Sequence, residues 1–354
     1  MLPFDLGQFI DSIVCRLSDV KMCNALIVTT VVNFPNVSSL FIICDKASSQ
    51  TGPDALLVNT YIACASNLRK FSLFTTSPNF NALFPLTPSV LTSLEEVTLT
   101  FTARDDHRAD AEAASTFLQA IASTLTTLTI SFSCTEDVPQ RLLHSIPRHG
   151  GQAAFPKLTT LSLLHSEHPA SPDSNLMQFL NQHADTLKHL SLQHTKPSPF
   201  LSQSLSDLDR LPVPVLPHLE TLDLINGSSS QTARSQELAS TEGVDVAWAY
   251  VQHSRNTLES LCLTNCSLTL HGLGMLLERF GHQSSESTEG QGLKSLTVTV
   301  EVLSPQMMDI LAEKLPQLER LKVNFTYLRS NDDTNFTMWT DQGRRADEIQ
   351  SYVS

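Results

Sequence analysis

Glycine is scarce in this chain, with 12 among 354 residues. Loops that cradle nucleotide phosphates need glycine where the backbone approaches the ligand closely, so the shortage disfavours a nucleotide-binding site. The sequence also lacks the G-x-S-x-G motif of serine hydrolases and the H-E-x-x-H motif of zinc proteases. We therefore expect no catalytic residues and no cofactor.

Basic charge is also in short supply. The chain has 23 lysines and arginines against 36 aspartates and glutamates, for a formal net charge of −13. Nucleic acids and anionic membrane surfaces are both bound through basic faces, so this balance argues against either partner. In addition, no run of apolar residues reaches the roughly 18 that a membrane-spanning helix requires.

Cysteines with paired spacing are missing as well. The seven cysteines are scattered and odd in number, which is typical of buried thiols in a reducing compartment. The N-terminal residues MLPFDLGQFIDS lack the basic region of a secretory signal. We therefore expect a cytoplasmic or nuclear protein. N-x-[ST] sequons keep an extracellular recognition protein as an alternative, and they lie at Asn36, Asn226, Asn265, Asn324 and Asn335.

What the chain does contain is a recurring leucine pattern. Residues 258–268 read L-E-S-L-C-L-T-N-C-S-L, which resembles the leucine-rich-repeat signature L-x-x-L-x-L-x-x-[N/C]-x-L. Leu261 and Leu263 alternate, so they should point to the same side of a short strand. Cys266, at the ninth position, is expected where the chain leaves the sheet. One such unit cannot bury its apolar face alone and needs copies on both sides.

Copies of the six-residue core L-x-x-L-x-L are present along most of the chain. They follow one another at steps of 25 to 39 residues, with hydrophobic replacements. The ten cores begin at Val37, Leu68, Leu94, Leu125, Leu158, Leu187, Leu219, Leu258, Leu293 and Leu318. The resemblance implies an α/β leucine-rich-repeat solenoid of the ribonuclease-inhibitor-like kind. In that fold a curved, parallel inner sheet is covered by outer helices, here in about ten irregular repeats.

Helices are expected between several of the cores, where apolar residues recur at helical spacing. The spacing predicts helices over 54–65, 109–123, 175–184, 244–253, 270–280 and 305–315. The last should have Ser304 as its N-cap. Its expected apolar face is Met308, Leu311, Ala312 and Leu315.

Two polar, Ser-rich segments interrupt the repeats. Residues 226–243 and 282–292 fall in the two longest steps, so they indicate surface loop insertions. The solenoid then spans 34–328, and residues 329–354 form a C-terminal cap or tail. Residues 1–33 precede the first core. Their apolar residues between Phe9 and Leu17 have helical spacing, which predicts an N-terminal helical cap over the open end of the core.

The N-terminal segment also resembles the first half of an F-box. The residues that carry the resemblance are Leu2, Pro3, Asp5, Leu6, Ile10, Ile13, Leu17, Asp19, Ala25, Leu26 and Val28. Irregular leucine-rich repeats with an F-box are typical of a large fungal set of substrate receptors for cullin-RING ubiquitin ligases. The resemblance implies that residues 1–33 engage a Skp1-type adaptor. The second half of the motif has no room before Val37, so this F-box is partial or degenerate.

The concave face of the expected sheet is the candidate surface for a protein partner. Its residues alternate with the core leucines, and they are mostly Ser and Thr in the middle strands. Exposed strands favour such residues in any case. Phe101 and Phe132 are expected to be core residues and not partner anchors. The candidate contact residues are Lys70, Glu96, Thr98, Thr129, Ser162, His165, His189, Ser191, His194 and Asp223.

Histidines recur in the middle repeats, but they lack the spacing of a zinc site. A zinc site needs four closely spaced ligands, usually including cysteines. His165 and His168 are expected on either side of a turn and His183 on a helix face, so we predict no metal. The least favoured alternative is an enzyme in which Asp105, His107, His165 and His194 converge within hydrogen-bonding reach. The sequence favours a non-catalytic protein-interaction scaffold.

Overall fold

The structure is a computed structural model. It describes residues 11–17, 36–44, 66–76, 91–102, 108–132, 142, 154–165, 174–194, 215–225, 250–281 and 292–328. These residues form an α/β protein with parallel strands and few helices. By its internal contacts the chain divides into two compact units. The first is Met1–Pro169 with Asp173–Thr186, and the second is Ala170–Pro172 with Leu187–Ser354.

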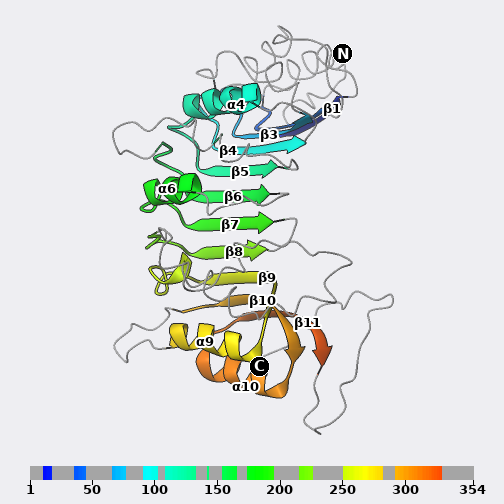
Figure 1. The fold of residues 1–354 in the computed structure, drawn as a ribbon. Coiled ribbons are helices and arrows are strands. Elements are labelled where there is room, and N and C mark those ends of the chain that lie inside the picture. The colour runs from blue at the N-terminus through cyan, green and yellow to red at the C-terminus, as the bar shows by residue number, and fades with distance from the viewer. Residues whose placement is uncertain are drawn as a thin grey trace, which may run out of the picture. The chain divides into compact units, whose positions relative to one another are not determined.

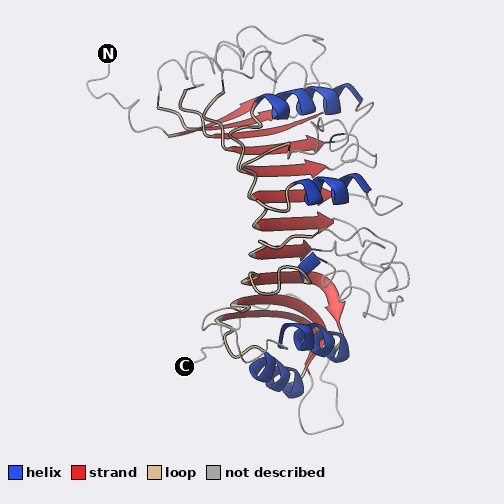
Figure 2. Ribbon diagram, turned by 90° about the vertical axis from the view of Figure 1, so that its left-hand side faces the viewer, coloured by secondary structure: helices blue, strands red, loops and turns tan. Residues whose placement is uncertain are grey.

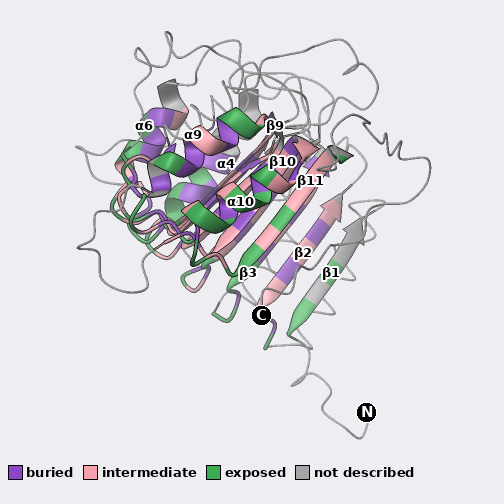
Figure 3. Cartoon of the chain, turned by 90° about the horizontal axis from the view of Figure 1, so that it is seen from below, coloured by how far each residue is buried: buried purple, intermediate pink, exposed green. Residues whose placement is uncertain are grey.

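The first unit contains parallel strands that pair in chain order. Figure 2 shows these strands side by side, and Figure 3 shows the helices α4 and α6 on one side of them. The elements are β1 (Ser12–Leu17), β2 (Ser39–Cys44), β3 (Lys70–Thr76), β4 (Glu96–Thr102), α4 (Arg108–Ala120), β5 (Thr127–Phe132), β6 (Thr160–His165) and α6 (Ser174–Gln182).

The second unit repeats this arrangement with its own parallel strands, again paired in chain order. Helices α9 and α10 lie together on one side of its strands. The elements are β7 (His189–His194), β8 (Thr221–Ile225), β9 (Ser260–Leu268), α9 (Leu270–Gly281), β10 (Ser295–Leu303), α10 (Pro305–Lys314) and β11 (Arg320–Leu328).

Corresponding core residues stand beside one another across neighbouring strands. Leu222 pairs with Leu261, and Leu261 pairs with Leu296. In the first unit the same row runs through Leu40, Phe71, Val97, Leu128 and Leu161. All of these side chains are at most 1% exposed. Because each strand covers the apolar side chains of the next, the row forms a continuous core within each unit.

Within each unit, each strand is joined to the next by the same backbone hydrogen bonds at its start. The carbonyl oxygen of Lys188 accepts from the backbone N–H groups of both Glu220 and Thr221. The carbonyl oxygen of Glu220 accepts from Glu259 and Ser260 in the same way. Other carbonyls that accept two such bonds belong to Asp11, Ser38, Arg69, Glu95, Thr126, Glu259 and Lys294. The chain therefore enters each strand with the same local geometry.

The predictions for individual elements are largely confirmed where the structure describes them. A strand occurs at each of the ten leucine cores. Helices α4, α6, α9 and α10 correspond to the predictions over 109–123, 175–184, 270–280 and 305–315. Ser304 caps α10, because its side chain accepts a hydrogen bond from the backbone N–H of Met307. No described helix is long and apolar enough to cross a membrane.

Other predictions lie outside the described residues. They concern the helix over 54–65, most of the helix over 244–253, the insertion at 226–243, almost all of the insertion at 282–292 and the tail at 329–354. Most of the predicted N-terminal cap over 1–33 also lies outside.

The helical prediction is wrong at Ser12–Leu17, which form strand β1. The apolar residues of this segment fit a strand as well as a helix, because Ile13, Cys15 and Leu17 alternate. Parallel pairing of β1 with β2 decides between the two, and it places Ile13 beside the buried Leu40. Tertiary hydrogen bonding has overridden the local spacing.

Two smaller predictions are also wrong. The chain does not leave the sheet at Cys266, since β9 continues to Leu268. A bulge accommodates the extra length: Leu263 pairs with Val298, and Leu268 pairs with Val300. In α10 the buried methionine is Met307, while Met308 is 39% exposed. Ala312 is exposed as well.

Candidate binding surface

The strands of each unit have one face that the described helices do not cover (Figure 3). We call it the open face. Its residues alternate with buried ones along every strand, as in the pattern of β8, where Thr221, Asp223 and Ile225 lie between the buried Leu222 and Leu224. Most side chains on this face are half-buried. The sequence-predicted contact residues whose side chains the structure describes all belong to it. By strand alternation His165 and His194 stand at core positions instead, since they follow Leu163 and Leu192 by two residues.

In the first unit, the open face carries an ion pair beside a row of hydroxyl groups. The Lys70 ammonium lies 2.9 Å from the Glu96 carboxylate on the neighbouring strand. The two charges therefore largely neutralise each other. Thr98, Thr129 and Ser162 are in register on β4, β5 and β6. This row presents small hydrogen-bonding groups to an approaching molecule.

Apolar side chains occupy the open face at the other end of the first unit. Val14 on β1 is 66% exposed and pairs with Phe41. Ile43 pairs with Phe74 on the same face, and both are half-buried. The sequence reasoning missed Val14, Ile43 and Phe74 as surface residues. The alternation along each strand could have identified Ile43 and Phe74 as residues of this face.

In the second unit, the predicted contact residues His189, Ser191 and Asp223 lie on adjacent strands β7 and β8. The Ser191 hydroxyl accepts a hydrogen bond of 3.2 Å from Nε2 of Gln193. Burial raises the pKa of the Asp223 carboxyl, and the nearby His189 opposes this effect. A partly desolvated carboxylate is a group from which a partner can gain binding energy.

The open face continues from Asp223 to Cys262, which pair across β8 and β9. Burial raises the pKa of the Cys262 thiol, which lies 3.1 Å from the Thr264 hydroxyl. A raised pKa keeps the thiol protonated and disfavours a nucleophilic role. Asp223 contributes to the increase, and Lys322 on β11 opposes it. Cys262 and Lys322 follow the same alternation as the predicted contact residues, but neither was among them.

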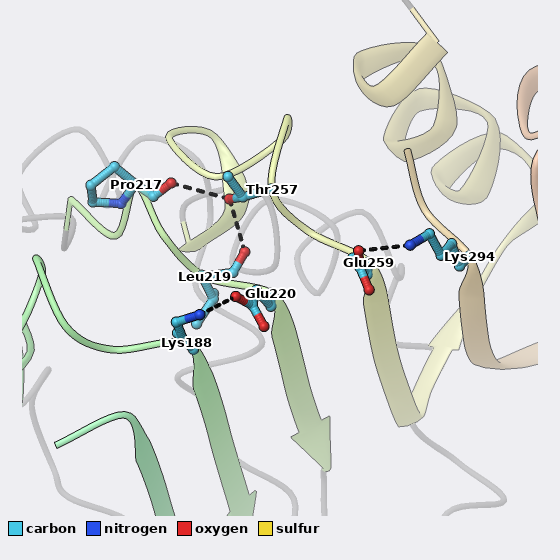
Figure 4. Close-up of polar contacts among 7 residues, drawn as sticks. All are labelled: Lys188, Pro217, Leu219, Glu220, Thr257, Glu259 and Lys294. Carbon is cyan, nitrogen blue, oxygen red and sulfur yellow. Dashed lines mark hydrogen bonds and ion pairs between the residues drawn. The ribbon is translucent and has the colours of Figure 1, made fainter. Parts of the chain in front are cut away.

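Paired charges border the open face of the second unit where its strands begin (Figure 4). The Lys188 ammonium is 2.6 Å from the Glu220 carboxylate, and the Lys294 ammonium is 2.7 Å from Glu259. Between them, the Thr257 hydroxyl lies 3.0 Å from the Leu219 carbonyl oxygen. These contacts connect successive strands at the point where the chain enters the sheet.

Histidine side chains do not form a metal site in the part of the chain that the structure describes. No group of three or more metal-binding side chains occurs there. His183 is buried with both ring nitrogens engaged: Nε2 accepts from the Phe155 backbone N–H and Nδ1 donates to the Phe179 carbonyl. Phe101 is a core residue, 3% exposed, as the sequence predicts.

Several sequence-selected side chains cannot be placed. His165 and His194 belong to strands, but their side chains lie outside the described residues, as does the side chain of Phe132. Asp105 and His107 also lie outside. The enzyme alternative requires these four side chains to converge, and all four lie outside the described residues.

No protein-family model matches the chain, and the search of curated proteins found no match either.

Proposed function

We propose that this chain is a leucine-rich-repeat solenoid that acts as a non-catalytic scaffold and binds a protein on the open face of its strands. The observation that carries the proposal is the repeated register. Every strand pair brings like core positions together, and one carbonyl oxygen repeatedly accepts two N–H groups from the next strand. Single leucine-rich repeats are stable only when they stack on neighbouring repeats, and the stacking generates an extended surface.

The width of the open face and its side chains favour a macromolecule over a metabolite as the ligand. Neighbouring strands lie ~4.8 Å apart, so the five strands of the second unit span on the order of 19 Å. The residues along them include small polar side chains such as Ser191 and Thr297, and the Lys188–Glu220 pair lies at the border of the face. Such a surface lets the backbone of a partner approach closely over many residues, which suits protein recognition.

A more specific version follows from the F-box resemblance. In it, the chain is a substrate receptor of a cullin-RING ubiquitin ligase in the cytoplasm or nucleus, and residues 1–33 engage a Skp1-type adaptor. Strand β1 occupies Ser12–Leu17 within that segment. Co-purification tests this version directly. It requires a Skp1-type adaptor that is recovered with the full chain and is lost when residues 1–10, which precede β1, are deleted.

Affinity capture with matched surface variants tests the main proposal. Thr98→Arg and Thr129→Arg add bulk to the open face of the first unit, and His189→Glu changes the face of the second. Ala120→Arg, at an exposed position of α4, is the control on the helical side. A specific partner should be lost with open-face variants that melt at the wild-type temperature, and it should be retained by Ala120→Arg. Retention by all open-face variants would move the binding site elsewhere.

A further inference from the structure

Asp223 and Lys322 occupy the same strand position on β8 and β11, at opposite ends of one row. Asp223 pairs with Cys262, Cys262 with Thr297, and Thr297 with Lys322. Each of the four follows a core position of its strand by one residue, so the whole row belongs to the open face. Three strand spacings separate the two charges, a distance of ~14 Å.

Neither charge has a partner among the described residues. No ion pair or hydrogen bond there engages the Asp223 carboxylate or the Lys322 ammonium. Four of the other five described lysines differ from Lys322, because ion pairs of 2.6 to 2.9 Å hold Lys70, Lys188, Lys294 and Lys314. His189 partly opposes the effect of burial on the pKa of Asp223, but no described ion pair replaces the hydration that this half-buried carboxylate has lost. A partner can supply the missing charges.

The space between the two charges holds an uncharged thiol and a hydroxyl group. Cys262 and Thr297 are both half-buried, so neither should prevent an extended chain from crossing the strands. Asp223 and Lys322 both influence the Cys262 thiol, with opposite effects on its pKa. The row therefore has a negative end, a neutral middle and a positive end.

We propose that this row binds an extended peptide segment that carries a basic and an acidic residue four positions apart. An extended chain advances ~3.4 Å per residue, and even-numbered steps return to the same side. Residues i and i+4 are then ~14 Å apart and face the sheet together, which matches the distance from Asp223 to Lys322. The basic residue lies over Asp223, and the acidic residue lies over Lys322. Arg320, exposed on the same strand, adds a second cation.

The inference rests on the proposed function, since it specifies the partner of the same open face. It also predicts the residue between the charges. Position i+2 lies over Cys262 and Thr297, so a small side chain is expected there. A longer side chain would lift the peptide away from the sheet and lengthen both ion pairs.

Selection from a displayed library of random twelve-residue peptides tests this inference on the full chain. Peptides that bind the wild type should be enriched in Lys or Arg four positions from Asp or Glu, in either order. Lys322→Asp should weaken these peptides about tenfold and select peptides with two basic residues at that spacing. Asp223→Lys should select peptides with two acidic residues. These changes follow from reversing one charge of a complementary pair.

Two variants on the helical side are matched controls. Lys314→Asp and Glu313→Lys make the same changes in net charge on α10, where both residues are already paired. They should leave the selected motif unchanged. Asp223→Asn covers the case in which Asp223→Lys does not fold, because it removes the charge at nearly constant volume. It should abolish the preference for a basic residue and keep the preference for an acidic one.

The outcomes separate this inference from the proposed function. Peptides without the four-residue spacing, or peptides insensitive to Lys322→Asp, overturn the inference. If such peptides are instead lost with Thr98→Arg, the open face still binds proteins and the proposed function stands. A library that yields no binder also overturns the inference, while the affinity capture described above judges the proposed function independently.

Discussion

The backbone N–H of Phe155 donates a hydrogen bond of 3.1 Å to Nε2 of His183, which joins the chain before β6 to the end of α6. The second ring nitrogen, Nδ1, lies 2.8 Å from the Phe179 carbonyl oxygen. The imidazole also stacks on the Phe155 ring, with centroids 5.8 Å apart. This geometry needs a neutral ring with its proton on Nδ1, so that Nε2 can accept.

Acid should therefore destabilise the first unit through His183. Burial lowers the pKa of His183, so the unfolded chain binds this proton at a higher pH than the folded chain does. The stabilisation is complete above the ordinary histidine pKa of ~6.5 and declines as pH falls below it toward the lowered folded value. Thermal melting between pH 5 and 8 measures the slope. His183→Gln should flatten it, whereas His253→Gln, at an exposed position, should not.

Removal of a core leucine should be costly in the row that crosses β8 and β9. Leu222→Ala or Leu261→Ala should lower the free energy of unfolding by ~2–5 kcal/mol, because each side chain is at most 1% exposed and leaves a cavity. Denaturant titration measures the loss. Leu270→Ala is the control, since Leu270 is 40% exposed and its replacement should cost far less. Similar losses for all three would contradict the continuous core.

A Leu→Ala substitution in the last strand, β11, should destabilise the protein less than one in a central strand. Leu321 on β11 pairs with the buried Leu296, but Leu321 itself is only half-buried. Leu321→Ala should therefore cost less than Leu296→Ala, for which we expect ~2–5 kcal/mol. The comparison uses the same denaturant titration. An equal cost at both positions would mean that residues beyond β11 cover Leu321 as fully as β9 and β11 cover Leu296.

The pair of Lys188 and Glu220 should contribute little to stability despite its 2.6 Å separation. Both side chains are substantially exposed, at 49% and 39%, so a double-mutant cycle with Lys188→Met and Glu220→Gln should give a coupling of ~0.2–1 kcal/mol. Lys188 lowers the pKa of Glu220. The coupling is therefore present above the ordinary carboxyl pKa and is lost as pH falls through the lowered one. A coupling that persists unchanged in 1 M salt would contradict this account.

Loss of the N-cap should destabilise α10. The Ser304 hydroxyl accepts a hydrogen bond of 3.3 Å from the Met307 backbone N–H, and Ser304 is buried. Ser304→Ala should cost ~1 kcal/mol in the free energy of unfolding, and Ser304→Asp should retain most of the stability. Chemical denaturation of both variants measures the difference. An aspartate variant as unstable as the alanine variant would argue against capping as the cause.

The strands could be predicted from the sequence because their pattern is local. Leu261 and Leu263 alternate within one hexamer, and the same spacing recurs ten times along the chain. The row from Asp223 to Lys322 was only partly predictable. Asp223 was among the sequence-predicted contact residues, whereas Lys322 was not. A charged side chain is available to a binding partner only if no neighbouring side chain pairs with it, and a sequence does not show which lysines are already paired.

The N-terminal segment shows most directly what the sequence alone could not predict. The apolar residues of Ser12–Leu17 satisfy both the helical and the strand period, and only hydrogen bonding to β2 selects the strand. The same holds in α10, where adjacent methionines make the buried face ambiguous until packing selects Met307. The sequence by itself determined which residues alternate and hence which faces are apolar. Tertiary structure alone decided which charges meet a partner, because pairing depends on residues about 30 positions apart being brought onto adjacent strands.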